Sequence, residues 1–461
     1  MSLQKNQIIP LQITALSNDG SGIGRCEGEA VFVPGTAPGD ELRVRILKDC
    51  GRYAFGRVES IAVPSAARRA PDCAVAAPCG GCSFRHLDYA AELEAKRSFV
   101  TDAFARIGGF SLAAEAVLPS PQQDRYRNKV QFPVGQDAAG HLCIGFYAGR
   151  THRIVPCSDC LLQPEELNRI AAFLCRACEA RGVTAYSEES GKGMLRHIFL
   201  RRGAHSGEIL LCLVCTQRSL PRQDTLVQEV TAAFPAVRTV VLNVNRQRTN
   251  VILGGENLTL YGPGTIGDTL CGVPIRLGPM SFYQVNTPAA EQLYAVAAAF
   301  AALRPQDRLL DLYCGMGTIG LSMAGSCAEL IGAEIVPEAI AAARASAAQM
   351  AAPAAQQARF LCADAGAAAQ QLLAEGLRPD VVMLDPPRRG CDEATLDAVL
   401  QMAPQRIVMV SCNPATAARD AKYLAARGYA PQRLQPVDLF PRTNHVELVC
   451  LLEKQAAALN G

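Results

Sequence analysis

Short runs in which apolar and polar residues alternate fill the first 60 positions of the chain. Gly and Asp interrupt them at short intervals, and the segments with this pattern are LQITALS, AVFVPG, ELRVRILK and FGRVESI. Alternation with turn residues at this spacing is typical of a small β-barrel. We therefore predict a barrel over residues 1–62, followed by a linker rich in Ala, Pro and Arg.

The pattern changes over residues 63–280. A helix is expected first, with Leu93, Val100 and Phe104 on a common face, until Gly108 ends it. The rest is rich in strands and contains one helix at about 164–180. The strand-like segments are VQFPV, CIGFYA, HIFLRR, EILLCLVC and TVVLNVN. We predict a mixed, strand-rich central domain.

From about residue 285 onward, strands alternate with Ala-rich helices. The segments that fit strands are LLDLYC, ELIGAEI, RFLCADA, DVVMLDPP, RIVMVSCNP and VELVCLLE. This alternation is typical of an open, doubly wound α/β sheet. The sequence therefore predicts an α/β fold for a third domain, residues 281–461.

Composition restricts the setting of the protein. The chain has 461 residues, of which 49% are hydrophobic and 19% charged, so it can build several globular cores. Its longest apolar runs are far shorter than the ~20 residues that span a bilayer, and the N-terminus lacks the pattern of a secretory signal. We expect a cytoplasmic protein without a membrane partner. Because the net charge is only +2, a nucleic-acid site has to come from local basic patches.

A glycine-rich turn follows the first strand of the α/β region, in LLDLYCGMGTIGL at 309–321. Glycines let the backbone approach a ligand closely, and such a turn aims amide groups at it. Glu334 lies 23 positions after Asp311 at the end of the next strand, where a carboxylate can accept hydrogen bonds from ribose hydroxyls. The glycines also satisfy G-x-G-x-x-G, so this pair indicates a nucleoside cofactor and fits either NAD or S-adenosylmethionine.

The segment VVMLDPPRRG at 381–390 ends a strand with Asp-Pro-Pro. It resembles the substrate loop of class I methyltransferases, in which prolines stiffen the loop and Asp385 projects beside the reacting centre. By itself it also fits a proline-rich turn after a buried strand. A further strand-end motif in the same domain, SCNP, favours the methyltransferase, and with it S-adenosylmethionine.

Cys412 stands just beyond the apolar run IVMV, at a predicted strand end. Carbon 5 of a pyrimidine has no electron pair to offer a methyl sulfonium, and a thiolate that adds to carbon 6 supplies one. A base must then remove the carbon 5 proton, and Glu447 in PRTNHVELVCLLE is a carboxylate that can do so. The alternative for Cys412 is a packing thiol, which is the default for most of the 19 cysteines.

A second group of cysteines has the spacing of a metal site. Cys73, Cys79 and Cys82 follow a C-x5-C-x2-C pattern with a Gly-Gly turn, and Cys157 and Cys160 offer a fourth ligand. Soft thiolate ligands favour zinc or an iron–sulfur centre, and spacing alone does not choose between them. Unligated packing cysteines are the alternative.

Five motifs together carry a family resemblance: SFYQVN, LDLYCGMGTIGL, DPPRRG, SCNPAT and PRTNHVE. They resemble the RNA (uracil-5-)-methyltransferase family, and the resemblance runs through most of the chain. It implies a class I methyltransferase sheet, an OB-like TRAM barrel that binds RNA, and methylation of carbon 5 of a uridine in RNA with S-adenosylmethionine.

The resemblance also implies roles for individual residues. Cys412 matches the nucleophile and Glu447 the base that takes the carbon 5 proton. Phe282 stands where the family places an aromatic near the target base, and Asp385 is also close to the uracil in family proteins. The positions matched to the cofactor pocket are Gln284, Tyr313, Glu334, Asp385, Asp311 and Gly315.

Family members with this cysteine pattern hold a 4Fe-4S cluster. The resemblance selects Cys160 as the fourth ligand beside Cys73, Cys79 and Cys82, with Cys157 as the alternative. Members that have both TRAM barrel and cluster mostly modify 23S ribosomal RNA, whereas those acting on the T-loop uracil of tRNA often lack both. We expect a monomer whose partner is 23S rRNA, with tRNA as the alternative, and no DNA partner.

Three rival functions are weighed against this one. An amine methyltransferase would carry an aromatic residue where Arg388 stands, and it has no use for Cys412. A DNA cytosine methyltransferase places its Pro-Cys nucleophile after the cofactor motif, whereas Pro156-Cys157 precedes it. A non-catalytic RNA-binding or assembly protein with a degenerate methyltransferase fold would not need to keep a thiol and carboxylates at these positions.

Overall fold

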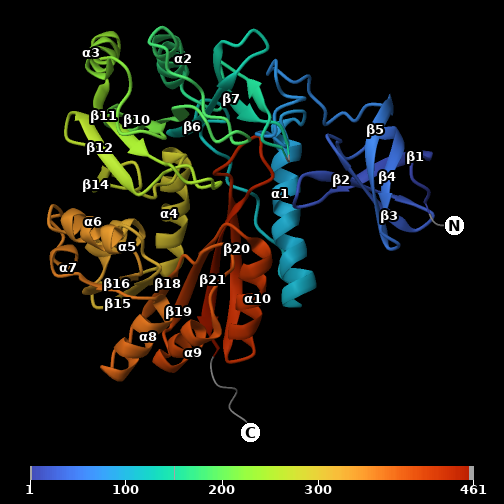
Figure 1. The fold of residues 1–461 in the computed structure, drawn as a ribbon. Coiled ribbons are helices and arrows are strands. Elements are labelled where there is room, and N and C mark those ends of the chain that lie inside the picture. Colours follow the sequence, from blue (N-terminus) through green and yellow to red (C-terminus); the bar gives the residue numbers. More distant parts are fainter. Residues whose placement is uncertain (1–2, 150, 456–461) are drawn as a thin grey trace.

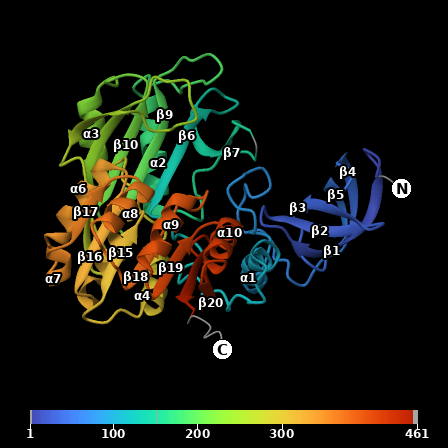
Figure 2. The same ribbon diagram turned by 90° about the horizontal axis from the view of Figure 1, so that it is seen from below.

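The computed structural model describes residues 3–149 and 151–455. A closed barrel and two seven-stranded sheets follow one another along the chain, with a two-stranded hairpin between the two sheets. Figure 1 shows the barrel standing to one side, while the central and C-terminal sheets lie against one another. Figure 2, seen from below, also shows the barrel apart from the two sheets.

The barrel closes in the order β1-β2-β3-β5-β4, with β4 pairing back onto β1. Alternate residues such as Val31, Val33, Val44 and Ile46 are fully buried in its interior. This confirms the predicted barrel. Its strands are β1 (Ile8–Leu16), β2 (Ser21–Cys26), β3 (Glu29–Pro34), β4 (Glu41–Asp49) and β5 (Tyr53–Val63).

Helix α1 (Tyr89–Ala103) begins where the side chain of Asp88 accepts the Ala91 N–H, and a π-helical turn, Phe104–Gly108, extends it. Val100 and Phe104 are fully buried, as the predicted common face requires, but Leu93 is only partly buried. The fully buried residues on that part of the helix are Glu92 and Lys96. They are ion-paired with each other, which allows charges to be buried there.

The central sheet has the order β12-β11-β10-β9-β6-β7-β8, and α2 (Glu165–Glu179) and α3 (Gln223–Ala233) pack on it. Its middle strands are buried almost throughout, which accounts for their continuous apolar runs. The strands are β6 (Lys129–Gln136), β7 (Leu142–Tyr147), β8 (Ile154–Pro156), β9 (Leu195–Arg202), β10 (Ile209–Cys215), β11 (Val237–Val244) and β12 (Glu256–Tyr261).

The hairpin of β13 (Ile266–Leu270) and β14 (Val273–Leu277) packs its apolar side chains into the core of the C-terminal sheet. That sheet has the order β17-β16-β15-β18-β19-β21-β20. The strands from β15 to β19 are parallel, whereas β21 runs antiparallel to both of its neighbours, β19 and β20. Their bounds are β15 (Arg308–Leu312), β16 (Glu329–Glu334), β17 (Arg359–Cys362), β18 (Val381–Leu384), β19 (Arg406–Ser411), β20 (Tyr429–Val437) and β21 (Glu447–Lys454).

Helices cover both faces of the C-terminal sheet, which confirms the predicted doubly wound fold. Met383 points into a core with α4 (Thr287–Ala301), α5 (Thr318–Met323) and α6 (Pro337–Ala347). Its neighbours Val382 and Leu384 point into the opposite core. The helices packed there are α1, α8 (Ala365–Ala374), α9 (Glu393–Met402) and α10 (Pro414–Ala425).

Candidate active site

Several strand ends meet at one edge of the C-terminal sheet. Strands β15, β16, β18 and β19 are parallel, so their carboxyl ends share this edge, and antiparallel β21 begins there. The order of strands reverses between β15 and β18, because β16 and β17 lie on one side of β15 and the later strands on the other. Open α/β sheets bind their ligands in the crevice at such a reversal.

The glycine-rich turn after β15 is tied to the acidic end of β16. Tyr313, Gly315 and Gly317 all have left-handed backbone, with φ of 64°, 55° and 74°. Gly315 donates its N–H to Oε2 of Glu334 at 3.2 Å, and the Val336 N–H donates to Oε1 at 2.9 Å. The turn and the carboxylate predicted to bind a nucleoside cofactor therefore lie side by side.

Asp311 lies fully buried just below this turn. Its Oδ2 accepts the Gly320 N–H at 2.9 Å, whereas its Oδ1 has no hydrogen-bond partner within the described part of the chain. Burial raises the pKa of Asp311 to about 7, and the charges of Asp385 and Glu334 act in the same direction. Three carboxyl groups thus converge on the cofactor edge.

Gln284 and Phe282 lie on the loop between β14 and α4, which the central domain holds. Arg201 donates to two carbonyl oxygens of this loop, at 2.9 and 2.7 Å, and Asn128 donates to the carbonyl of Gln284 at 2.8 Å. The ring of Phe282 is 71% exposed. An anchored loop with a free aromatic ring can present that ring to a flat ligand.

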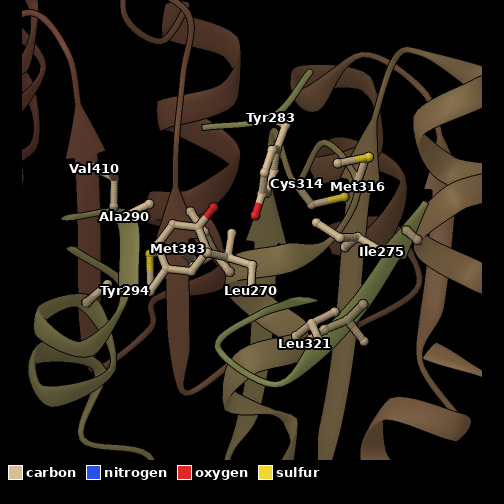
Figure 3. Packing of buried hydrophobic residues seen from close by; sticks show 14 of the residues in the cluster. Leu270, Ile275, Tyr283, Ala290, Tyr294, Cys314, Met316, Leu321, Met383 and Val410 are labelled. Atoms are coloured by element: carbon tan, nitrogen blue, oxygen red, sulfur yellow. The ribbon is translucent and has the colours of Figure 1, made fainter. Parts of the chain in front are cut away.

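A dense core supports the site from below. Figure 3 shows Tyr283, Tyr294, Met316 and Met383 packed together in it. The hydroxyl of Tyr294 lies 3.0 Å from that of Thr318, the first residue of α5. The turn that faces the cofactor edge is therefore backed by close packing, which limits its movement.

Cys412 and Glu447 face each other across two neighbouring strands. Cys412 follows the last residue of β19, Glu447 is the first residue of antiparallel β21, and Ser411 pairs with Leu448. Cys412 is partly exposed, whereas Glu447 is buried. The sheet register alone therefore brings the predicted nucleophile and the predicted base together.

Arg388 completes this group. Burial raises the pKa of the Cys412 thiol and the charge of Glu447 raises it further, whereas a hydrogen bond and the charge of Arg388 lower it. Burial raises the pKa of Glu447 to about 8, the charge of Asp385 adds to this, and Arg388 opposes it. Burial also raises the pKa of Asp385 to about 7. The charges of Glu447, Asp385 and Arg388 all act on the thiol, so these groups share one site.

Arg388 was not predicted as a site residue. Its backbone carbonyl accepts hydrogen bonds from Asn413 Nδ2 at 2.9 Å and from Thr416 Oγ1 at 3.3 Å. Asn413 also caps α10 by accepting the Ala415 N–H. The residue after the thiol therefore holds the loop of the arginine. The position of Arg388 in DPPRRG, three residues after Asp385, was the available signal.

The cysteine group lines one cavity of about 240 Å³. Burial, together with the charge of Cys160, raises the pKa of Cys82 and of Cys157 to about 12 each. Arg85, Arg127 and Lys129 belong to the same wall. Over residues 3–149 and 151–455, however, no three His, Cys, Asp or Glu side chains are arranged to hold a metal ion. The fold gathers the thiols, and Cys157 and Cys160 both line the cavity.

The barrel carries an aromatic cluster on its outer surface. Phe32, Tyr53 and Phe55 are the only aromatic residues in positions 1–62, and their ring centroids lie 5.6–5.9 Å apart. Tyr53 is 41% exposed. Lys48 lies opposite Phe55 on β4, and Arg57 follows two residues later on β5; both are exposed. Exposed rings beside cations are the elements of a single-stranded nucleic-acid surface.

The strand order, the glycine-rich turn, the acidic end of β16 and the thiol at the sheet edge define a class I methyltransferase that uses S-adenosylmethionine. A family model described as tRNA (Uracil-5-)-methyltransferase matches residues 273–455, and a model of the TRAM domain matches residues 3–58.

Relatives match along almost the whole chain. Uncharacterized RNA methyltransferases of Bacillus cereus and Listeria innocua are each 40% identical, and one of Clostridium tetani is 38% identical. These matches cover 98% of this chain and 97–98% of each relative. The chain therefore belongs to the RNA (uracil-5-)-methyltransferase family, and it is an S-adenosylmethionine-dependent RNA uracil-C5 methyltransferase.

A solved structure agrees with this assignment. The Pyrococcus abyssi tRNA (uracil-54, C5)-methyltransferase in complex with S-adenosyl-L-homocysteine superposes with a TM-score of 0.76 and 28% identity. The match covers 96% of this chain and 99% of that one.

Within the described residues, no helix is both long and apolar enough to cross a membrane.

Proposed function

We propose that this enzyme methylates carbon 5 of a uridine in 23S ribosomal RNA, with Cys412 as nucleophile and Glu447 as base. The observation that supports these two roles best is their opposed position at the ends of β19 and β21, where the register pairs Ser411 with Leu448. A flipped-out uracil at this edge can meet the thiol on one face and the methyl donor on the other.

The chemistry follows from these positions. The Cys412 thiolate donates its electron pair to carbon 6, and the carbon 5–carbon 6 double bond becomes an enolate. S-adenosylmethionine, when bound, would supply an electrophilic methyl group. The enolate pair at carbon 5 forms the new carbon–carbon bond to it, while the electron pair of the broken methyl–sulfur bond stays on sulfur as S-adenosylhomocysteine. Glu447 then takes the carbon 5 proton, the C–H electron pair restores the double bond, and the thiolate leaves.

The charged neighbours have matching tasks. Arg388 favours the thiolate, because its guanidinium lowers the pKa of Cys412. The raised pKa of Glu447, about 8, makes its ionised form a stronger base for a weakly acidic carbon 5 proton. Asp385 stands beside both groups and, in its neutral form, can donate a hydrogen bond to a uracil oxygen.

The cofactor pocket that we propose surrounds the glycine-rich turn. Glu334 accepts hydrogen bonds from the ribose hydroxyls, and the Gly315 backbone lets the cofactor approach closely. The free Oδ1 of Asp311 lies under the same turn. The half-buried Tyr313 and Gln284 line the remaining sides, and Phe282 stacks on the target base.

Two features support ribosomal RNA as the substrate. The chain carries the TRAM barrel and the five-cysteine cavity, which together resemble the branch of the family that acts on 23S rRNA. Tyr53 and its neighbouring rings extend the RNA-binding surface onto the barrel. We keep residues 1–62, 63–280 and 281–461 as the proposed barrel, central and catalytic domains.

A tRNA T-loop uridine is the second candidate. It is favoured by one observation, the likeness along 96% of the chain to a protein described as a tRNA (uracil-54, C5)-methyltransferase. Both candidates use the same chemistry, so they differ only in which RNA fits the central domain and barrel.

The cysteine cavity fits a 4Fe-4S cluster as a structural cofactor. A cluster spreads its thiolates more widely than a single ion, and a cavity of about 240 Å³ with five cysteines in its wall can hold one. The ligands would be Cys73, Cys79, Cys82 and Cys160, with Cys157 as the alternative fourth. The neighbouring cations offset the net negative charge of such a thiolate-bound cluster. The methyl transfer needs no electrons, so its contribution would be to fold.

The decisive experiment uses RNA in which uracil is replaced by 5-fluorouracil. Fluorine cannot leave as a cation, so with S-adenosylmethionine a covalent complex should accumulate on 23S rRNA and be lost in Cys412→Ala. Mapping the linked nucleotide identifies the uridine. Accumulation on tRNA alone would select the second candidate, and no complex with either RNA would contradict the proposed role of Cys412.

A further inference from the structure

The segment that leads into the proposed base, residues 438–446, is held first by α1. The ammonium group of Lys96 donates to Asp438 Oδ1 at 2.7 Å and to the carbonyl of Phe440 at 3.2 Å. Glu92 accepts from Lys96 at 2.7 Å and from the Arg442 N–H at 2.8 Å. These charged groups are buried, so their hydrogen bonds cannot be exchanged cheaply for water.

The next residues are held by the barrel and by the cysteine segment. Asn444 donates its Nδ2 to the carbonyl of Asn18, in the turn between β1 and β2, at 2.6 Å. Ser83, directly after Cys82, donates to Asn444 Oδ1 at 2.8 Å and accepts the Asn444 N–H at 3.0 Å. One side chain therefore joins the barrel, the cysteine segment and the chain that carries the base.

His445 follows this anchor and reaches the catalytic group. Its Nδ1 accepts from Arg388 Nη2 at 3.1 Å, and its ring packs edge-on against Phe440 with centroids 5.9 Å apart. The backbone of Arg388 is fixed by Asn413, but its side chain is exposed and would otherwise sample many rotamers. The imidazole is thus one contact that orients the guanidinium, and the hydrogen bond to the Cys412 thiol is another.

We propose that His445 is a positioning residue that holds the Arg388 guanidinium beside the Cys412 thiol. Asn444 fixes the position of His445 in turn. The barrel and the cysteine segment therefore influence the surroundings of the Cys412 thiol, although neither of them contacts it. This gives the N-terminal modules a role in catalysis besides contact with RNA. The inference rests on the proposed role of Cys412 as nucleophile.

The test measures the thiol directly, in the full-length protein without RNA or cofactor. Alkylation of Cys412 by iodoacetamide is followed by peptide mass spectrometry across a range of pH, because only the thiolate reacts. His445→Ala should slow alkylation at pH 7 on the order of tenfold and move the profile to higher pH, since a tenfold change corresponds to one pH unit. His445→Asn should restore it, because Asn Oδ1 is as many bonds from the backbone as His Nδ1.

Two further variants serve as the reference for a full loss of the arginine and as the negative control. Arg388→Gln should move the profile at least as far as His445→Ala. His141→Ala removes a histidine whose Nδ1 lies 2.8 Å from Glu179, on helix α2 of the central sheet, and it should leave the profile unchanged. An unchanged profile in His445→Ala, or an Asn variant no better than Ala, would overturn the positioning role.

The link to the barrel has its own variants. Asn444→Ala and Ser83→Ala should displace the alkylation profile in the same direction by a smaller amount, with thermal unfolding and S-adenosylmethionine affinity as checks on the fold. Profiles identical to wild type in both would overturn the anchoring. Failure of wild-type enzyme to form the 5-fluorouracil complex would instead remove the nucleophile role, and the alkylation data distinguish the two cases.

Discussion

The catalytic edge and the cysteine cavity both collect residues that lie far apart in the sequence, but the fold collects them in different ways. The thiol and the carboxylates of the edge sit at the ends of strands, and hydrogen-bonded register determines where they lie. Cys412 and Glu447 face each other because Ser411 pairs with Leu448. The cysteines belong to irregular segments before α1 and after β8, where no ladder sets distances.

This difference distinguishes a site that is already ordered by the fold, the sheet edge, from a site that a ligand would order, the cysteine cavity. Backbone pairing holds the thiol and the carboxylate of the sheet edge in the arrangement that the proposed mechanism needs before any ligand binds. The cavity brings five thiols to one place, yet within the part of the chain that the structure describes they form no single-ion site. A ligand that binds several of them at once would order such a cavity as it binds.

The largest expected effect tests the preorganised edge. Replacing Cys412 by Ala should lower methyl transfer on the order of 10⁴-fold, because removal of a covalent nucleophile leaves only binding and orientation. The matched control is Cys50→Ala, a half-buried thiol in the barrel, which should keep wild-type turnover. Methyl incorporation into RNA measures both, and substantial activity in Cys412→Ala would refute the mechanism.

The second effect separates the two partners of the edge. Glu447→Gln should lower turnover by about 10²–10⁴-fold, the usual loss for a general base, while addition and methylation still proceed. The covalent complex with ordinary uracil RNA should therefore accumulate, as a band of reduced mobility in a denaturing gel. A variant that loses turnover without accumulating this complex would show that Glu447 acts earlier in the reaction.

The pH dependence tests the raised pKa values at the edge. Glu447, with a pKa of about 8, must lose its proton to act as a base, and Cys412, whose pKa is also raised, must be a thiolate. Turnover should therefore rise with pH between 6 and 8, by about 50-fold from the carboxylate alone, since the ionised fraction grows about tenfold per pH unit far below the pKa. Single-turnover rates measure this, and a flat profile would contradict the assignment.

The cavity is tested by removing a thiol. Cys82→Ser should abolish bound iron, remove the visible absorbance of a cluster and lower the unfolding temperature, with turnover falling less than in Cys412→Ala because no step passes through the cluster. Cys143→Ser, a half-buried thiol outside the cavity, is the control. If wild-type protein purified without oxygen contains zinc and no iron, the cavity is a zinc site and the proposed cluster is wrong.

The smallest effect concerns the barrel. Tyr53→Ala removes one stacking ring and should weaken RNA binding by about 1–3 kcal/mol at most, since that is the measured range for a stacked base. S-adenosylmethionine binding should be unchanged. Filter binding at fixed salt measures the RNA affinity, with Tyr261→Ala, another exposed tyrosine outside the barrel, as the control. Equal affinities for the two variants would place the RNA away from the aromatic cluster.

Several elements were predictable because their signal is local. The strands from β15 to β19 and β21 each read as an apolar run that ends in a polar motif, and parallel strands share an edge. Strand β20 was not predicted, because Pro431 and Pro436 interrupt its strand-like pattern. It lies at the edge of the sheet, where proline is tolerated. The buried pair of Glu92 and Lys96 was missed because Asp438, the other carboxylate that pairs with Lys96, is more than 300 positions away.

The sequence by itself determined which thiol, which carboxylates and which glycine-rich turn stand at strand ends, since apolar periodicity and turn residues are local features of the chain. The chemistry that we propose rests on these residues. Only the tertiary structure decided which other side chains reach them. Arg388 beside Cys412, the three rings gathered on the barrel and the contact of Asn444 with Asn18 depend on packing between distant segments. Such contacts follow from the balance of burial and hydrogen bonding over the whole molecule, which no short stretch of sequence contains.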